Sequence, residues 1–206
     1  MNHVVTYEKE PKAIAAAIEP GGNLMGLTDG RFSKIDLVLA IAEHLAPVKR
    51  VTISTWCAAQ KDIRASRDLL DSPAIGDMRW VVDKSFLARQ PEYVKDIMAR
   101  FGTHAIRVWM CHSKFVIFTG AAGDRDTLLL TSMNLKTNRR IENFQLITHG
   151  PTVQAYDELV TDIYRIQEPG EALEHPKRIP GQTQRALETR EQRLERVWKL
   201  HREKHG

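Results

Sequence analysis

The sequence predicts an α/β protein built on a mixed β-sheet flanked by helices, with a helical tail at the C-terminus. Two observations support this fold class. Between residues 34 and 110, short apolar runs of strand length alternate with longer amphipathic runs of helix length, which is typical of a sheet covered by helices. Between residues 113 and 134, two apolar runs follow each other directly across a loop rich in Gly and Asp, as in a β-hairpin.

Local patterns predict each element of the first half in turn. A helical stripe of apolar residues covers 34–45 and is closed by Pro47, and a run rich in β-branched residues over 50–56 predicts the first strand. The elements expected after it are a helix over 60–72, a strand over 77–83, a helix over 91–102 that begins near Pro91 and ends at Gly102, and strands over 105–110 and 113–118.

The pattern changes after residue 118. We expect a hairpin loop over 119–126, a strand over 127–134, a further strand over 142–149 and a helix over 152–166. The compact domain is therefore predicted to cover residues 1–166. Residues 167–182 contain three prolines and two glycines and read as a linker. Residues 183–206 are charged and helix-prone, with Leu187, Leu194 and Trp198 near one stripe.

Composition places the chain among globular proteins. Its 206 residues are 42% hydrophobic with a mean hydropathy of −0.37. The longest apolar run, residues 35–48, contains Glu43 and His44 and is shorter than the roughly 20 residues that a membrane span requires. The N-terminus lacks the basic start and apolar run of a secretory signal. We therefore expect a cytoplasmic protein that makes no contact with a membrane.

Charge and cysteine content narrow the class of site. The net charge of +4 and the pI near 9.1 suit a polyanionic partner without identifying one. Cys57 and Cys111 are too few for a disulfide framework and lack the paired spacing of a zinc site. The sequence also lacks an HExxH motif and a dense Asp/Glu cluster. We expect a reaction that uses neither a metal nor another cofactor.

One pair of polar residues lies at the start of a predicted strand, and a second pair lies at the end of the next predicted strand. His112 and Lys114 precede the apolar run at 115–118, and Ser132 and Asn134 follow the next run. Residues at i and i+2 of an extended chain share one face, so each pair presents two functional groups together. Glu142 follows shortly after, at the start of the strand over 142–149. Each pair alone is a weak signal, and their order along the chain strengthens it.

This order of an HxK, a Ser-x-Asn pair and a carboxylate resembles the signature of the phospholipase D superfamily, in the branch with one motif copy that includes bacterial homodimeric endonucleases. The resemblance covers about residues 33–165. It implies that His112 attacks phosphorus to form a covalent phosphohistidine, and that Lys114 and Asn134 hold the non-bridging oxygens with support from Ser132. It also implies that Glu142 accepts a hydrogen bond from the imidazole of His112.

The chemistry of phosphodiester cleavage suggests a dimer. In-line displacement needs a nucleophile on one side of the phosphorus and a proton donor on the other, so one imidazole does not easily serve both. The other seven histidines of the chain lie outside any second HxK motif followed by Ser-x-Asn. We therefore expect a homodimer in which His112 of each subunit faces the same phosphate. The two histidines would titrate as a coupled pair.

Two departures from the family pattern keep other functions open. Thr119 stands where the family usually has Asp, five residues after the Lys, and Thr131 stands where it usually has Gly. The family's tyrosyl-DNA phosphodiesterases also lack this Asp. The alternative to an enzyme is a non-catalytic nucleic-acid-binding or structural protein that retains the fold. A third reading is a phospholipid phosphodiesterase, which the absence of an apolar loop or membrane anchor makes less favourable.

The expected substrate of the enzyme is DNA or RNA, which would make the protein a nuclease; the resembled branch contains endonucleases, and the sequence leaves endonucleolytic and exonucleolytic cleavage both open. Lys136, Arg139 and Arg140 lie between the Ser-x-Asn pair and Glu142, where they would contact a nucleic-acid backbone in a salt-dependent way. The alternative for these three residues is an ordinary solvated loop. The basic residues of the C-terminal tail could form a nucleic-acid arm, but a mixed-charge helix is more often a solvated face or a docking element for a partner.

Overall fold

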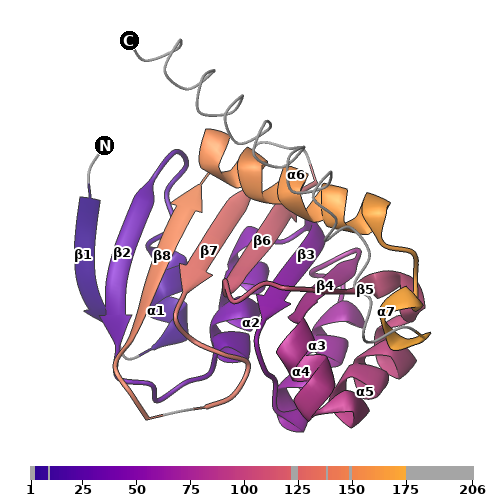
Figure 1. Cartoon of the computed structure of the whole chain (residues 1–206). Helices are drawn as coiled ribbons and strands as arrows, with labels where there is room; N and C mark the ends of the chain where they lie inside the picture. The colour runs from indigo at the N-terminus through magenta and orange to yellow at the C-terminus, as the bar shows by residue number, and fades with distance from the viewer. Residues whose placement is uncertain (1–2, 9, 122–124, 138, 149, 175–206) are drawn as a thin grey trace.

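One eight-stranded mixed sheet organises the computed structural model of the chain (Figure 1). The structure describes residues 3–8, 10–121, 125–137, 139–148 and 150–174. The strand order is β1-β2-β8-β7-β6-β3-β4-β5. The strands are β1 (His3–Glu8), β2 (Asn23–Thr28), β3 (Val48–Thr55), β4 (Met78–Asp83), β5 (Ile106–Trp109), β6 (Phe115–Gly120), β7 (Thr127–Thr131) and β8 (Glu142–Thr148).

Helices cover both faces of this sheet. In the view of Figure 1, α6 crosses in front of the upper part of the sheet, while α1 and α2 lie behind it. The helices are α1 (Pro11–Ala16), α2 (Lys34–Leu45), α3 (Gln60–Leu70), α4 (Lys84–Arg89), α5 (Pro91–Phe101), the 3₁₀ turn η1 (Thr103–Ala105), α6 (Pro151–Ile166) and α7 (Glu171–Glu174). In the described part of the chain, no helix has the length and apolar character that crossing a lipid bilayer requires.

The predicted fold class, a mixed sheet flanked by helices, is confirmed. Every strand and helix predicted between residues 34 and 166 is present, with ends displaced by a few residues. The sequence did not predict β1, α1, β2, α4, the 3₁₀ turn or α7. The omission of β2 matters for the site, because this strand pairs with β8 beside the polar segments.

Strand direction brings distant segments to one edge of the sheet. β6 runs antiparallel between β3 and β7, and β8 runs antiparallel between β7 and β2. The carboxyl ends of β2, β3 and β7 therefore meet the amino ends of β6 and β8. Ser54 pairs with Phe115, which in turn pairs with Leu130. The segment that precedes Phe115 consequently lies between the ends of β3 and β7.

Helix ends follow from local chemistry. Ser33 caps α2 through a capping box, in which its hydroxyl accepts from the Asp36 backbone while Asp36 accepts from the Ser33 backbone at 2.7 Å. Pro91 occupies the first turn of α5, and Gly102 closes that helix with a φ of 85°. Pro91 and Gly102 are the signals from which the sequence predicted α5, whereas α2 was predicted from its apolar stripe and Pro47, and its capping box was not used.

The core lies on both faces of the central strands. β4 has four successive buried residues, 80–83, and β3 is buried from residue 51 to residue 55, as expected for strands covered on both sides. On one face, Tyr156 of α6 packs edge-on against Phe115, with ring centroids 5.0 Å apart. Trp80 is fully buried and contacts Phe101 of α5 at 5.3 Å. The central strands thus form a close-packed base beneath the strand ends where the polar segments meet.

The chain continues to pack on the sheet beyond α6. The buried side chain of Gln167 accepts from the backbone N–H of Val108 and donates to its carbonyl, both at 2.8 Å. Gln167 thereby satisfies the outer backbone groups of the edge strand β5. The charged helix expected over 183–206, and the end of the expected linker, lie outside the described residues.

We predict that Gln167→Leu lowers the free energy of unfolding by about 2–3 kcal/mol, because the buried N–H and C=O of Val108 lose their partners. Urea denaturation measures this change. Gln154→Leu, at an exposed position of α6, is the matched control and should change stability by less than about 0.5 kcal/mol. Equal stability of the two variants would contradict the packing of Gln167 on β5.

Candidate active site

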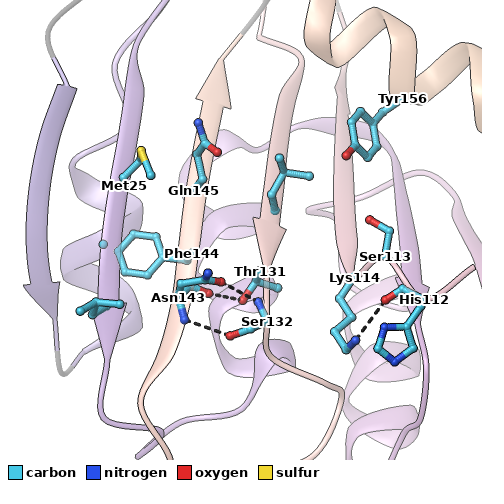
Figure 2. A pocket seen from close by; sticks show the side chains of 13 residues that line it. Met25, His112, Ser113, Lys114, Thr131, Ser132, Asn143, Phe144, Gln145 and Tyr156 are labelled. Atoms are coloured by element: carbon cyan, nitrogen blue, oxygen red, sulfur yellow. Dashed lines mark hydrogen bonds between the residues drawn. The ribbon is translucent and has the colours of Figure 1, made fainter. Parts of the chain in front are cut away.

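A cleft of about 640 Å³ opens on the sheet near the edge where the polar segments meet (Figure 2). One end is polar and holds the segments before β6, after β7 and at the start of β8. The other end is largely apolar and is formed by β2, β7 and α6. The residues that line the cleft are Met25, Gly26, Leu27, His112, Ser113, Lys114, Leu130, Thr131, Ser132, Asn143, Phe144, Gln145 and Tyr156.

His112 and Lys114 lie side by side in this cleft, in an irregular stretch before β6 rather than within the strand. The ammonium of Lys114 donates to the backbone carbonyl of His112 at 3.0 Å, which Figure 2 shows as a dashed line. The imidazole of His112 is exposed, and its ring meets the Trp56 ring edge-on at a centroid distance of 5.3 Å. An accessible imidazole and a fixed positive charge therefore share one surface.

Three neighbouring strand ends hold the backbone around His112 and Lys114. The carboxylate of Asp83, at the end of β4, accepts from the N–H of Cys111 at 3.0 Å. The hydroxyl of Ser54 in β3 donates to the carbonyl of Ser113 at 2.8 Å. The N–H of Thr131 in β7 donates to the carbonyl of Lys114 at 3.1 Å. These contacts tie three backbone groups of a short irregular segment to the ends of three strands.

Ser132 is held by the start of β8. Its hydroxyl donates to the carboxylate of Glu142 and accepts from the N–H of Asn143 at 3.0 Å. The N–H of Ser132 donates to the side-chain oxygen of Asn143 at 2.9 Å. The side-chain oxygen of Asn143 is therefore engaged as an acceptor, and its NH2 group is a donor that a ligand in the cleft could meet.

The structure brings most, but not all, of the predicted site residues together. His112, Lys114 and Ser132 line the cleft, and Glu142 adjoins it through Ser132. Glu142 bonds to Ser132 in the structure, whereas the resemblance paired it with His112. Asn134 does not line the cleft, and its buried side-chain oxygen has no hydrogen-bond partner in the described part of the protein.

The predicted nucleic-acid contacts lie on a nearby loop. Lys136, Arg139 and Arg140 are exposed between β7 and β8. The loop starts from the sheet beside Ser132, and Leu135 forms a bridge with Ala58 that anchors it. Lys61 of α3 donates to Thr137 at 2.8 Å and anchors the loop a second time.

Two residues that the sequence did not single out as site residues complete the polar end. Asn143 follows Glu142 directly, and its alternation across β8 could have indicated that it faces the cleft. Trp56 contacts His112 from the end of β3, and the guanidinium of Arg89 lies over the Trp56 ring at 3.8 Å. No local signal reveals this contact, because Trp56 and His112 are distant in sequence.

The apolar end of the cleft exposes large hydrophobic side chains to solvent. Met25 and Leu27 of β2 point into the cleft with 42% and 44% of their surfaces accessible. Leu130 and Tyr156 continue this surface toward α6. The cleft therefore has an imidazole and an ammonium at one end and an apolar surface at the other.

A buried amine lies beneath the polar end. Lys34, at the start of α2, is completely buried, and its ammonium donates to the carbonyl of Ser54 at 2.7 Å. Burial, and then the positive charge of Lys114, lower the pKa of Lys34 to about 7. Cys57 and Cys111 act weakly in the opposite direction. Near neutral pH this amine is thus present in both protonation states.

Comparisons with known proteins identify no relative by sequence: no family model and no curated protein matches the chain. Solved structures similar to it include polyphosphate kinase from Porphyromonas gingivalis, with a TM-score of 0.48 and 15% identity over 72% of this chain and 27% of that chain. Phosphatidylserine synthase from Haemophilus influenzae has a TM-score of 0.47 and 15% identity over 72% of this chain and 38% of that chain.

A mutant of yeast tyrosyl-DNA phosphodiesterase 1 is also similar, with a TM-score of 0.36 and 13% identity over 70% of this chain and 41% of that chain. In each case the chain spans less than half the length of the other protein. Similarity of this extent assigns neither a family nor an activity. The functional argument therefore rests on the residues of the cleft.

We predict that Lys34→Met stabilises the protein at pH 6 by up to about 5 kcal/mol, because the buried charge is removed. The folded pKa of about 7 lies below the unfolded value of 10.5, so the unfolded chain binds more protons between these limits. The destabilisation by Lys34 is complete below pH 7 and disappears as the pH rises toward 10.5.

Urea denaturation at several pH values measures the difference, which should shrink steadily from pH 7 to pH 10. The matched control is Lys49→Met at an exposed position of β3, for which no such trend is expected. A pH-independent effect of Lys34→Met would show that Lys34 keeps an ordinary pKa.

Proposed function

We propose that the protein is a metal-independent phosphodiesterase of the phospholipase D type, acting as a nuclease on DNA or RNA through a covalent phosphohistidine. One observation carries this proposal: an exposed imidazole and an ammonium, His112 and Lys114, share a cleft with the Ser132–Asn143 pair from the next hairpin. A nucleophile, a positive charge and neutral donors are the groups that phosphoryl transfer needs around phosphorus.

In the proposed first step, an imidazole nitrogen of His112 attacks phosphorus, and the bond from phosphorus to the leaving oxygen breaks. Lys114 and the amide nitrogen of Asn143 hold the non-bridging oxygens. The resemblance assigned the amide role to Asn134, and Asn143 is better placed because it lines the cleft. Glu142 orients Ser132 through their hydrogen bond, and Ser132 keeps Asn143 in position.

The departing alkoxide needs a proton from the side opposite His112. Among the described residues that line the cleft, His112 is the single histidine. We therefore retain the proposal of a homodimer in which the imidazolium of the second copy's His112 protonates the leaving oxygen. In the second step that imidazole removes a proton from water, water attacks the phosphohistidine, and the bond from phosphorus to nitrogen breaks.

A nucleic-acid substrate agrees with the charge around the cleft. Lys136, Arg139 and Arg140 are exposed on the loop that leaves the sheet at Ser132, and Arg89 stacks over Trp56, whose ring contacts His112. Basic side chains near a phosphoryl site would guide a polyanionic backbone across it, with a strong dependence on salt.

A phospholipid phosphodiesterase is the second candidate, and the exposed Met25 and Leu27 favour it. An acyl chain would lie along this apolar surface while its phosphate occupies the polar end. Head-group release from phosphatidylcholine vesicles, compared with cleavage of single-stranded and double-stranded nucleic acids, separates these two substrates. A protein that binds nucleic acid in a salt-dependent way with no turnover would instead be the non-catalytic form of the fold.

We predict that His112→Ala reduces nuclease activity by roughly 10³-fold or more, because the nucleophile is lost, while EDTA leaves the native activity unchanged. Radiolabelled substrate should leave label on the protein that is stable in alkali and released by acid, as expected of a phosphorus–nitrogen bond. His44→Ala, in the exposed last turn of α2, is the matched control. Undiminished activity in His112→Ala would refute this role.

We further predict that His112→Ala protein inhibits the native enzyme when the two are mixed at constant total protein and allowed to exchange subunits. Only dimers with two intact His112 residues are active, so an equal mixture should retain about one quarter of the maximal activity rather than one half. Sedimentation measures the dimer directly. A linear loss of activity with the native fraction, or an active monomer, contradicts the shared site.

A further inference from the structure

Lys34 is a buried cation without a counter-ion in the described part of the protein. Its side chain is inaccessible, and its ammonium has one hydrogen-bond acceptor, the carbonyl of Ser54 at 2.7 Å. No described Asp or Glu forms an ion pair with it. Burying an unpaired ammonium is costly unless the group gives up its proton. The amine thus has two accessible states, and its surroundings decide between them.

The position of Lys34 connects it to the cleft. Ser54 accepts from Lys34 through its carbonyl and donates through its hydroxyl to the carbonyl of Ser113 at 2.8 Å. Ser113 stands between the two residues proposed to meet the phosphate, His112 and Lys114. A single residue of β3 therefore separates the buried amine from the segment that carries the anion site.

Charged and titratable groups reach this region from each element packed around Lys34. Lys114, from the segment before β6, disfavours its protonation, whereas the thiols of Cys57 after β3 and Cys111 after β5 favour it. On the helix side, Asp36 and Asp62 bond to Ser33 at the start of α2. Of these groups, Lys114 is the one that also lines the cleft.

We propose that Lys34 takes up a proton when an oxyanion binds between His112 and Lys114, so that occupancy of the cleft adds a second positive charge, beneath that of Lys114. This inference rests on the anion site of the proposed function. It adds to that function a buried positioning residue whose charge is present when the site is filled.

The coupling follows from electrostatics in a poorly solvated region. An anion beside Lys114 offsets the positive charge that opposes protonation of Lys34, and burial limits screening by solvent. Because the pKa of Lys34 is about 7, a modest change in its surroundings changes its charge at neutral pH. By linkage, the anion then binds more tightly to the protonated protein by the same factor.

The test follows the Lys34 ammonium by NMR of lysine labelled at the terminal carbon and nitrogen, with sulfate as the probe. Sulfate resembles a phosphoryl group and does not titrate near neutral pH. The measurement uses the full chain with His112→Asn, which removes the imidazole as a competing proton acceptor. The Lys34 signal is identified as the one that disappears from the spectrum when Lys34→Arg is introduced. The exposed Lys49 is the internal control.

We expect a Lys34 midpoint near pH 7 without sulfate and a midpoint at least about one pH unit higher at saturating sulfate, which corresponds to tenfold tighter binding to the protonated form. The Lys49 signal should not move. In parallel, sulfate affinity should fall at least about sixfold between pH 6.5 and pH 8.5, the part of the tenfold limit that this pH range covers, and this decline should be absent in Lys34→Met.

Two results would overturn the inference. One would leave the anion site of the proposed function standing, and the other would contradict that site as well. If sulfate shifts the Lys114 signal while the Lys34 midpoint stays unchanged, the coupling is wrong and the anion site stands. If sulfate shifts neither signal, the anion site of the proposed function fails together with the coupling. Both readings use protein that retains Lys34, so they do not depend on whether Lys34→Met folds.

Discussion

The antiparallel placement of β6 between β3 and β7 is the constraint on which the site depends. It brings the segment before Phe115 to the sheet edge where β3 and β7 end. The same reversal at β8 places Glu142 and Asn143 beside the end of β7. Polar groups from two hairpin-related segments consequently converge without any long loop. The backbone ladder of the sheet, rather than side-chain contacts, determines this convergence.

At the polar end of the cleft, hydrogen bonds hold the backbone of the segment from Cys111 to Lys114, and a buried amine without a carboxylate partner lies beneath it. Asp83, Ser54 and Thr131 each hold one backbone group of the segment from Cys111 to Lys114, so the imidazole and the ammonium are presented from a fixed base. Beneath this base, Lys34 is buried with a carbonyl rather than a carboxylate as its partner. When protonated, such a group lowers stability and raises the electrostatic potential around it.

One chain supplies the cleft with one imidazole, one ammonium and neutral hydrogen-bond donors. Ser132, Glu142 and Asn143 satisfy one another through hydrogen bonds, which leaves His112 with the Trp56 ring as its neighbour. The apolar surface of Met25 and Leu27 extends the cleft away from these groups. A second imidazole from another subunit would complete the proton transfers, whereas the positive charge and neutral donors are already present in one chain.

The sequence by itself determined the alternation of strands and helices and the positions of His112, Lys114, Ser132 and Glu142, because hydrophobic period and short motifs are local properties. The tertiary structure decided which of the predicted site residues lie together at the cleft. Asn134 lies away from the cleft because the chain leaves β7 after Thr131 and Leu135 pairs with Ala58. Trp56 and Lys34 reach the site through contacts and burial between distant segments, which a linear pattern does not encode.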